Sequence, residues 1–331
     1  MYTLYGSEYS YFTKKLEMAM RFSGVPHIRK QLTYDIREMV ASRSGTKQMP
    51  VLQTPEGWMI ADSTPIIHML DERYPTRRMF PEGPMGVFVQ VVEEYFDEWI
   101  SRVVLHFRWN HPESRAYASR GLAEEILPEA ADSDIESAAG KIADWGARAC
   151  QATGVSEEIG RNGAEDEYER ILVEAEKQLR ETRFLLGDRP CAVDAVVLGG
   201  LLGHMNKDPD PRKVVRRFPV VRDWCEERGL SWDGEGDLAP VPLCTPFARF
   251  VLGEMSAHYK PFLLANRRAL AAREESCVTN SYGEPVSYMT REYPEQSARM
   301  IGERIEHLDG RSRMEMETLL RGYDLWDCFM P

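Results

Sequence analysis

The first 75 residues alternate short apolar runs with stretches in which apolar residues recur at steps of three and four. The short runs predict strands and the periodic stretches predict helices, because side chains repeat their direction about every 2 residues in a strand and every 3.6 in a helix. Gly24 is placed to end the first of these helices. The order of elements predicts a mixed four-stranded sheet packed between helices. The predicted strands are residues 2–6, 25–33, 50–52 and 58–60, and the predicted helices are residues 13–23, 36–42 and 64–73.

A linker is predicted at residues 76–84, which contain two prolines and a glycine. Beyond it almost every periodic segment is helical, and residues 191–204 are so apolar that we expect them in the centre of the core. Residues 128–165 are small, acidic and glycine-bearing, which suggests partial mobility. Two domains are therefore predicted, an α/β domain at residues 1–76 and an all-helical domain at residues 85–331. The predicted helices of the second domain are residues 87–108, 167–183, 191–204, 214–228, 246–272 and 297–323.

Charge and cysteine usage narrow the class of protein. The formal net charge of −12 argues against a nucleic-acid or membrane-surface partner held by charge. Six cysteines without CxxC spacing fit reduced thiols better than a disulfide framework. The chain starts directly in a strand and has no apolar run of about 18 residues, so neither a signal peptide nor a membrane span is expected. A cytoplasmic protein is the expectation.

Residues 48–63 carry the most specific pattern in the chain. Pro50 heads a strand, where it cannot donate to the sheet, and a cis bond before it would turn the backbone towards a ligand. Asp62 and Ser63 open a helix, whose free backbone N–H groups form an anion site. Together these features suit an extended peptide that carries a carboxylate.

With Tyr2-Thr3-Leu4-Tyr5-Gly6 and Ser10-Tyr11-Phe12-Thr13 upstream, this pattern resembles the amino-terminal domain of the glutathione transferase superfamily, in its bacterial type with a serine or cysteine at the site. The resemblance covers about residues 2–75. A second part, residues 184–194, is similar to the family's segment that enters the buried core helix. The resemblance to this family implies a thioredoxin-like domain followed by an all-α domain. Residues after about 235 exceed the family's common length.

The resemblance implies glutathione as cosubstrate. Val51 would pair its backbone with the cysteinyl part, after a cis bond between Met49 and Pro50. Asp62 would bind the γ-glutamyl amine and Ser63 its carboxylate, a role compatible with starting the helix. The glycyl carboxylate would be reached by Lys47 and Gln48.

Glutathione chemistry needs a thiolate, which a hydroxyl donor and a helix amino terminus both stabilise. In relatives the first residue of the Ser-Pro-Phe motif faces the sulfur, so Ser10 is the first candidate. Tyr11, which replaces the proline, is a rival, as are Thr13 and Tyr9. The alternative is that Ser10 or Thr13 only caps the helix. No cysteine lies in this loop, which argues against a mixed-disulfide mechanism.

The acceptor substrate should bind an apolar surface of the helical domain. Aromatic residues at helical spacing are candidates for that surface, although such a stripe is more often core. Arg102 and Arg108 would meet an acidic substrate or, more simply, pair with surface carboxylates. The seven histidines show no zinc-ligand spacing, so no metal is expected. The aromatic candidates are Tyr95, Trp99, Phe107 and Trp109.

The leading hypothesis is a homodimeric glutathione transferase-like enzyme that activates the thiol for attack on an apolar electrophile. One alternative is a glutathione-dependent lyase or etherase of the same fold. The other is a binding or regulatory protein that kept the fold and lost turnover, an interpretation that Tyr11 and the long carboxy-terminal extension favour.

Overall fold

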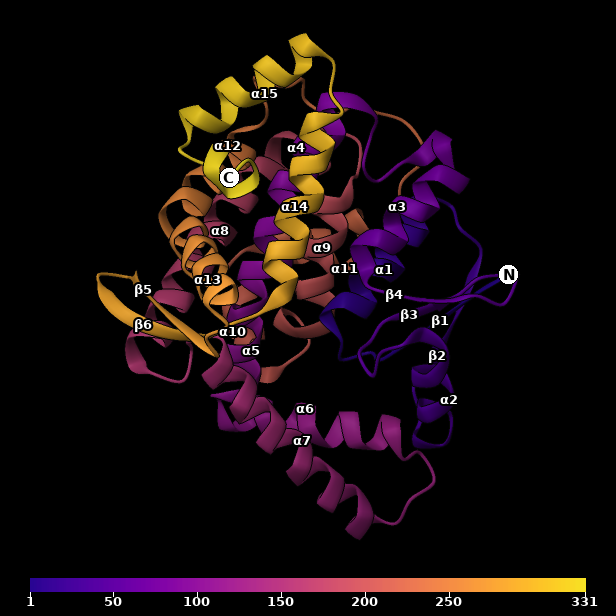
Figure 1. Ribbon diagram of the computed structural model, residues 1–331. Coiled ribbons are helices and arrows are strands. Elements are labelled where there is room, and N and C mark those ends of the chain that lie inside the picture. The colour runs from indigo at the N-terminus through magenta and orange to yellow at the C-terminus, as the bar shows by residue number, and fades with distance from the viewer. The chain divides into compact units, whose positions relative to one another are not determined.

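The computed structural model describes residues 1–331, and its first 73 residues form the predicted α/β arrangement (Figure 1). The sheet has the order β2-β1-β3-β4, in which β1 is parallel to β2 and antiparallel to β3, and β3 is antiparallel to β4. This is a thioredoxin-like domain. Its elements are β1 (Tyr2–Gly6), α1 (Tyr11–Phe22), β2 (His27–Gln31), α2 (Tyr34–Ser44), β3 (Val51–Gln53), β4 (Met59–Ala61) and α3 (Ser63–Arg73).

Helices cover both faces of the sheet. Helices α1 and α3 pack together on one face, and α2 lies on the other (Figure 1). Under α2 a buried apolar cluster joins Tyr5 of β1 and Val51 of β3 to Leu32 and Val40. The burial of these apolar side chains stabilises the sheet against its helices.

The rest of the chain is largely helical, as predicted. Long segments such as residues 83–109 and 246–272 run continuously, with a π-helical stretch inside each. Residues 132–152 of the segment that suggested mobility form the helix α7. The helical elements up to residue 205 are η1 (Pro75–Arg77), α4 (Gly83–Glu94), η2 (Tyr95–Ile100), α5 (Ser101–Trp109), α6 (Pro112–Ile126), α7 (Asp132–Ala152), α8 (Glu158–Glu181), α9 (Ala192–Gly200) and η3 (Leu201–Met205).

One hairpin departs from the all-helical expectation. Strands β5 (Ser276–Ser281) and β6 (Glu284–Met289) pair antiparallel through a tight turn. The long helix expected at residues 297–323 is two helices, and the one expected at residues 214–228 breaks at Phe218 before Pro219. The remaining helical elements are α10 (Pro209–Val215), α11 (Pro219–Glu226), η4 (Arg228–Leu230), α12 (Pro246–Glu254), η5 (Met255–Tyr259), α13 (Lys260–Ala272), α14 (Glu292–Glu306), α15 (Gly310–Gly322) and α16 (Trp326–Phe329).

The chain divides into two compact units, each built from three segments. The first unit contains Met1–Met79, Phe107–Ala147 and Asp194–Gly234, and the second contains Phe80–His106, Arg148–Val193 and Glu235–Pro331. The domain boundary at residues 76–85 stays a prediction. All six cysteines are free and buried, and none of the helices combines the length and the apolar character that crossing a membrane requires.

Candidate functional site

The register of the sheet brings three segments of the first unit to one edge. Tyr5 pairs with Val51, so the loop that follows β1 and the residue that precedes β3 leave the sheet on the same side. Val51 also pairs with Ala61, so Asp62 leaves on that side too. The peptide bond between Met49 and Pro50 is cis, as predicted. The hydroxyl-rich loop, the proline and the Asp-Ser pair therefore adjoin one another in the fold.

Ser10 is the N-cap of α1, which begins two residues earlier than predicted. Its Oγ accepts the backbone N–H of Thr13 at 3.2 Å. A hydroxyl that accepts this bond still has its own proton to donate. The side chain is partly exposed, and it stands where the positive end of the helix dipole favours an anion. Capping and donation to a ligand are compatible at this residue.

Tyr11 and Thr13 are placed differently from Ser10. Tyr11 is buried, with its ring 5.0 Å from that of Phe12 and 6.3 Å from that of His204. Thr13 is fully buried, and its Oγ1 accepts the N–H of Ser7 at 3.4 Å. Both side chains thus have packing roles inside the first unit, whereas Ser10 and its rival Tyr9 are partly exposed.

Glycines allow α1 to lie directly on α9 and η3. A Cβ atom at Gly199 would stand 2.8 Å from the backbone of Tyr11 and Lys15, and one at Gly203 would stand 3.1 Å from the backbone of Ser10. At Gly200 it would meet the ring of Tyr11 at 2.7 Å. Because real Cβ atoms rarely approach so closely, only glycine permits this contact.

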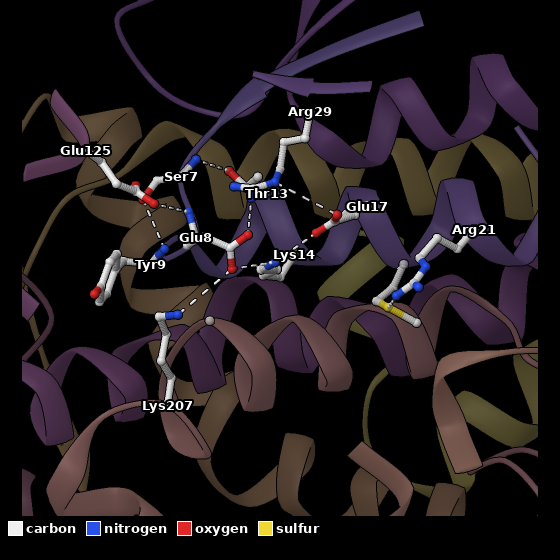
Figure 2. A network of polar contacts seen from close by, with 12 residues as sticks. Ser7, Glu8, Tyr9, Thr13, Lys14, Glu17, Arg21, Arg29, Glu125 and Lys207 are labelled. Carbon is white, nitrogen blue, oxygen red and sulfur yellow. Dashed lines mark hydrogen bonds and ion pairs between the residues drawn. The ribbon is translucent and has the colours of Figure 1, made fainter. Parts of the chain in front are cut away.

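Polar contacts hold the loop between β1 and α1 (Figure 2). The Ser7 hydroxyl donates to the Glu125 carboxylate, which also accepts the N–H of Glu8 at 3.1 Å. Glu8 itself pairs with Lys14 at 2.8 Å, with Arg29, and with Lys207 at 3.9 Å. Burial acts to raise the pKa of Glu8, but these cations outweigh it and hold the pKa below its ordinary value. The loop therefore carries a charged carboxylate at neutral pH.

Asp62 has an unusual backbone for its residue type. Its φ is +72°, and its Oδ1 accepts the N–H of Thr64 at 3.4 Å as the N-cap of α3. Such a conformation costs on the order of 1–3 kcal/mol and is found at ligand sites more often than elsewhere. Asp62 is exposed and Ser63 is buried, so the carboxylate faces solvent beside the helix start. Beneath them the buried Lys15 donates to Thr64 Oγ1 at 2.7 Å.

The residues around the proline complete this edge. Pro50 and Val51 are buried, Met49 is half-buried and packs on the cluster under α2, and Gln48 is exposed. The N–H of Gln48 donates to Thr46 Oγ1 at 3.1 Å, which leaves its amide side chain at the surface.

Both arginines that were expected at the surface are buried. Arg102 belongs to the second unit and donates to Glu167. Arg108 belongs to the first unit and pairs with Asp208, and it donates to the carbonyl of Tyr9 in the site loop. No local pattern signals these pairs, because their partners lie 65 and 100 positions away.

The aromatic stripe proposed for an acceptor substrate is core. Each of its four members is at most 4% exposed. Tyr95 and Trp99 donate hydrogen bonds to Glu167 inside the second unit. Glu167, Glu254 and His258 each place a possible metal-ligand atom within 4.8 Å of the others, but Glu167 already accepts hydrogen bonds from four side chains. Its carboxylate is an internal acceptor.

Residues 4–78 match the family model described as "Glutathione S-transferase, N-terminal domain". The amino-terminal domain therefore belongs to the glutathione transferase superfamily, and the resemblance in its sequence is confirmed. Comparison with curated proteins finds none that matches.

Solved structures similar to this chain include the following three. A glutathione S-transferase from Rhodospirillum rubrum F11 is 17% identical, with 76% of this chain and 99% of that chain covered and a TM-score of 0.45. Gtt2 from Saccharomyces cerevisiae is 16% identical, with 70% and 97% covered and a TM-score of 0.43. The β-etherase LigF from Sphingobium sp. strain SYK-6 is 13% identical, with 76% and 99% covered and a TM-score of 0.49.

Proposed function

We propose that this protein binds glutathione at the sheet edge formed by the site loop, Pro50–Val51 and Asp62–Ser63, and activates its thiol for attack on an apolar electrophile. The observation that carries this proposal is the register, which aligns Tyr5, Val51 and Ala61 across three strands. A peptide laid along this edge would meet backbone groups at Val51, an anion site at Ser63 and the hydroxyl of Ser10.

Each end of glutathione has a partner of suitable chemistry. The exposed carboxylate of Asp62 would pair with the γ-glutamyl amine, and the start of α3 at Ser63 would accept the γ-glutamyl carboxylate. The exposed amide of Gln48 would bind the glycyl carboxylate. The Ser10 hydroxyl would donate a hydrogen bond to the thiolate, with the N-terminus of α1 behind it.

A second candidate is a glutathione-binding protein without turnover. It is favoured by the burial of Tyr11 and Thr13, which leaves Ser10 as the one partly exposed hydroxyl of the three. If Ser10 only caps α1, activation of the thiol falls to the helix dipole and to Tyr9, whose side chain is also partly exposed. A lyase or etherase would use the same site with a different leaving group.

A cytoplasmic homodimer remains our expectation for the assembly and location of this protein, and light scattering at micromolar concentration tests the dimer.

Calorimetric titration with glutathione tests the proposed site. Ser63→Ala should weaken binding roughly 10- to 150-fold, because a hydrogen bond to a charged group contributes about 1.5–3 kcal/mol. Asp62→Ala should also weaken it, while both variants stay folded, since a lost cap costs about 1 kcal/mol. The matched controls are Ser42→Ala and Asp35→Ala on the exposed side of α2. Absence of binding to the wild-type protein, or equal affinity in all five proteins, would reject the site. Turnover of an activated aryl halide then separates an enzyme from a binder.

A further inference from the structure

The side chain of Arg108 is only 2% exposed, and each of its three guanidinium nitrogens donates a hydrogen bond. Its Nε donates to Asp208 Oδ2 at 2.6 Å and its Nη2 to Asp208 Oδ1 at 3.0 Å. Nη2 also donates to the carbonyl of Gly203 at 2.6 Å, and Nη1 to the carbonyl of Tyr9 at 2.6 Å. Nη1 lies 3.1 Å from His204 Nε2. All these residues belong to the first unit.

Two of the acceptors are backbone carbonyl groups, and they show which segments Arg108 connects. The carbonyl of Tyr9 belongs to the peptide unit that joins Tyr9 to Ser10, so its hydrogen bond to Arg108 fixes the plane of that peptide. Gly203 also packs against this peptide, since a Cβ there would stand 3.1 Å from the backbone of Ser10. The guanidinium group therefore ties the loop to the π-helical turn η3 immediately before the N-cap of α1.

The positive charge of Arg108 is neutralised by Asp208, so its role is to position the groups that it binds. Asp208 is fully buried and is bonded through both carboxylate oxygens, which leaves little net charge to act on a ligand. A buried ion pair is seldom the most favourable way to stabilise a fold, and its best attested role is to fix one arrangement among several. The planar fork of arginine suits this role because its donors have fixed directions.

We propose that Arg108 is a positioning residue, which fixes the Tyr9–Ser10 peptide so that the Ser10 hydroxyl faces the thiol of bound glutathione. This inference rests on the proposed function. It predicts that Arg108 affects the ionisation of the thiol through Ser10 alone and leaves the anion site at Ser63 unchanged.

The test uses Arg108→Lys in the full-length protein, because lysine keeps the positive charge beside Asp208 and loses the planar fork. The thiolate absorbance of bound glutathione should titrate at higher pH than in the wild type, by about as much as in Ser10→Ala. Glutathione affinity at low pH, where the thiol is protonated, should change by less than about threefold. Adding Ser10→Ala to Arg108→Lys should produce no further shift. Arg120→Lys, on the exposed face of α6, is the matched control.

A second variant keeps the test decisive if Arg108→Lys does not fold. Gly203→Ala crowds the backbone of Ser10 and keeps both members of the Arg108–Asp208 ion pair, so the same shift in the thiol titration is expected. Amide hydrogen exchange gives an independent readout, since the N–H of Thr13 is protected by Ser10 Oγ and should exchange faster in both variants. An unchanged thiol titration in the variants, while Ser10→Ala shifts it, overturns the positioning role. If the wild-type protein does not bind glutathione, the proposed function is rejected instead. If, in addition, the N–H of Thr13 exchanges at the wild-type rate in both variants, the role of Arg108 in fixing the loop is rejected as well.

Discussion

The hydroxyl group of Tyr282 donates a hydrogen bond to the carboxylate of Glu167, a residue 115 positions earlier in the chain. Tyr282 is the first residue of the two-residue turn between β5 and β6, and its φ of +58° is rare for a tyrosine. Glu167 is fully buried and also accepts hydrogen bonds from Tyr95, Trp99 and Arg102. The hairpin is thereby fastened to the interior of the second unit, and its strained turn is held by a polar network.

Glu167→Gln should destabilise the second unit strongly. The substitution leaves the guanidinium of Arg102 buried without its carboxylate, and breaking one side of a buried ion pair costs about 3–5 kcal/mol. Urea unfolding followed by circular dichroism measures this loss. Asp166→Asn, at the exposed neighbouring position, is the control and should stay within about 0.5 kcal/mol of the wild type. If Glu167→Gln lowers the free energy of unfolding by less than about 1 kcal/mol, the ion pair between Arg102 and Glu167 does not stabilise the network.

Gly199→Ala should destabilise the first unit. Its Cβ would stand 2.8 Å from the backbone of both Tyr11 and Lys15, and overpacking of this kind costs about 1–3 kcal/mol. Gly140→Ala, in α7 of the same unit, adds a Cβ that meets nothing within 4 Å, and it should stabilise by up to about 1 kcal/mol. Thermal unfolding of the two variants should therefore shift in opposite directions, and a shift in the same direction would contradict the close contact.

Ser10→Ala should raise the pKa of the glutathione thiol in the complex and lower turnover at neutral pH. The loss should shrink as pH rises, because the thiol then ionises without a donor. Tyr11→Phe is the control, since it removes a buried hydroxyl and keeps the ring. The pH–rate profile of both variants decides the assignment. A profile that moves with Tyr11→Phe and stays in place with Ser10→Ala would transfer the role to the tyrosine.

Glu94→Gln should change how stability depends on pH. Burial and the nearby charge of Glu98 raise the pKa of Glu94 in the folded protein, where its carboxyl group accepts hydrogen bonds from Tyr259 and Ser297. The folded state therefore keeps this proton to higher pH than the unfolded state, whose glutamate titrates near about 4.3. The stability from this group is fully present below that pH and is lost as pH rises towards the folded pKa.

The free energy of unfolding of Glu94→Gln should thus gain on that of the wild type above about pH 4.3, by up to about 1.4 kcal/mol for each pH unit within that window. Urea unfolding at a series of pH values measures the difference. Glu303→Gln, on the exposed face of α14, should show no such trend. A constant difference between Glu94→Gln and the wild type across this range would show that the carboxyl group is not held protonated.

Local patterns predicted most of the elements, because their signals lie within a few residues of one another. The strand at Tyr2–Gly6 follows directly from a short apolar run, and the start of α3 beside Asp62 follows from capping. The hairpin was missed although Tyr282-Gly283 separates two alternating runs, since a tyrosine is an unusual first residue for a turn that requires positive φ.

Sequence reasoning brought together the segments of the candidate site, but it could not foresee which of their side chains are buried. Ser10, Pro50 and Asp62 could be placed at one edge because a sheet of this topology brings their segments together. The burial of Tyr11 depends on Gly200, which lies 189 positions later, and no local pattern reports such a contact. Arg108 was assigned to the surface for the same reason, since its partner Asp208 is distant in the chain.

The three glycines under α1 also provide a marker that can be read in other sequences. In a homologous chain with larger residues at the positions of Gly199, Gly200 and Gly203, the first helix could not pack this closely against the helix that contains them. The residue at the position of Ser10 would then stand farther from the helix that supports it here. Homologues can therefore be sorted by these positions, without any measurement, into those that share the geometry of this loop and those that must build a different one.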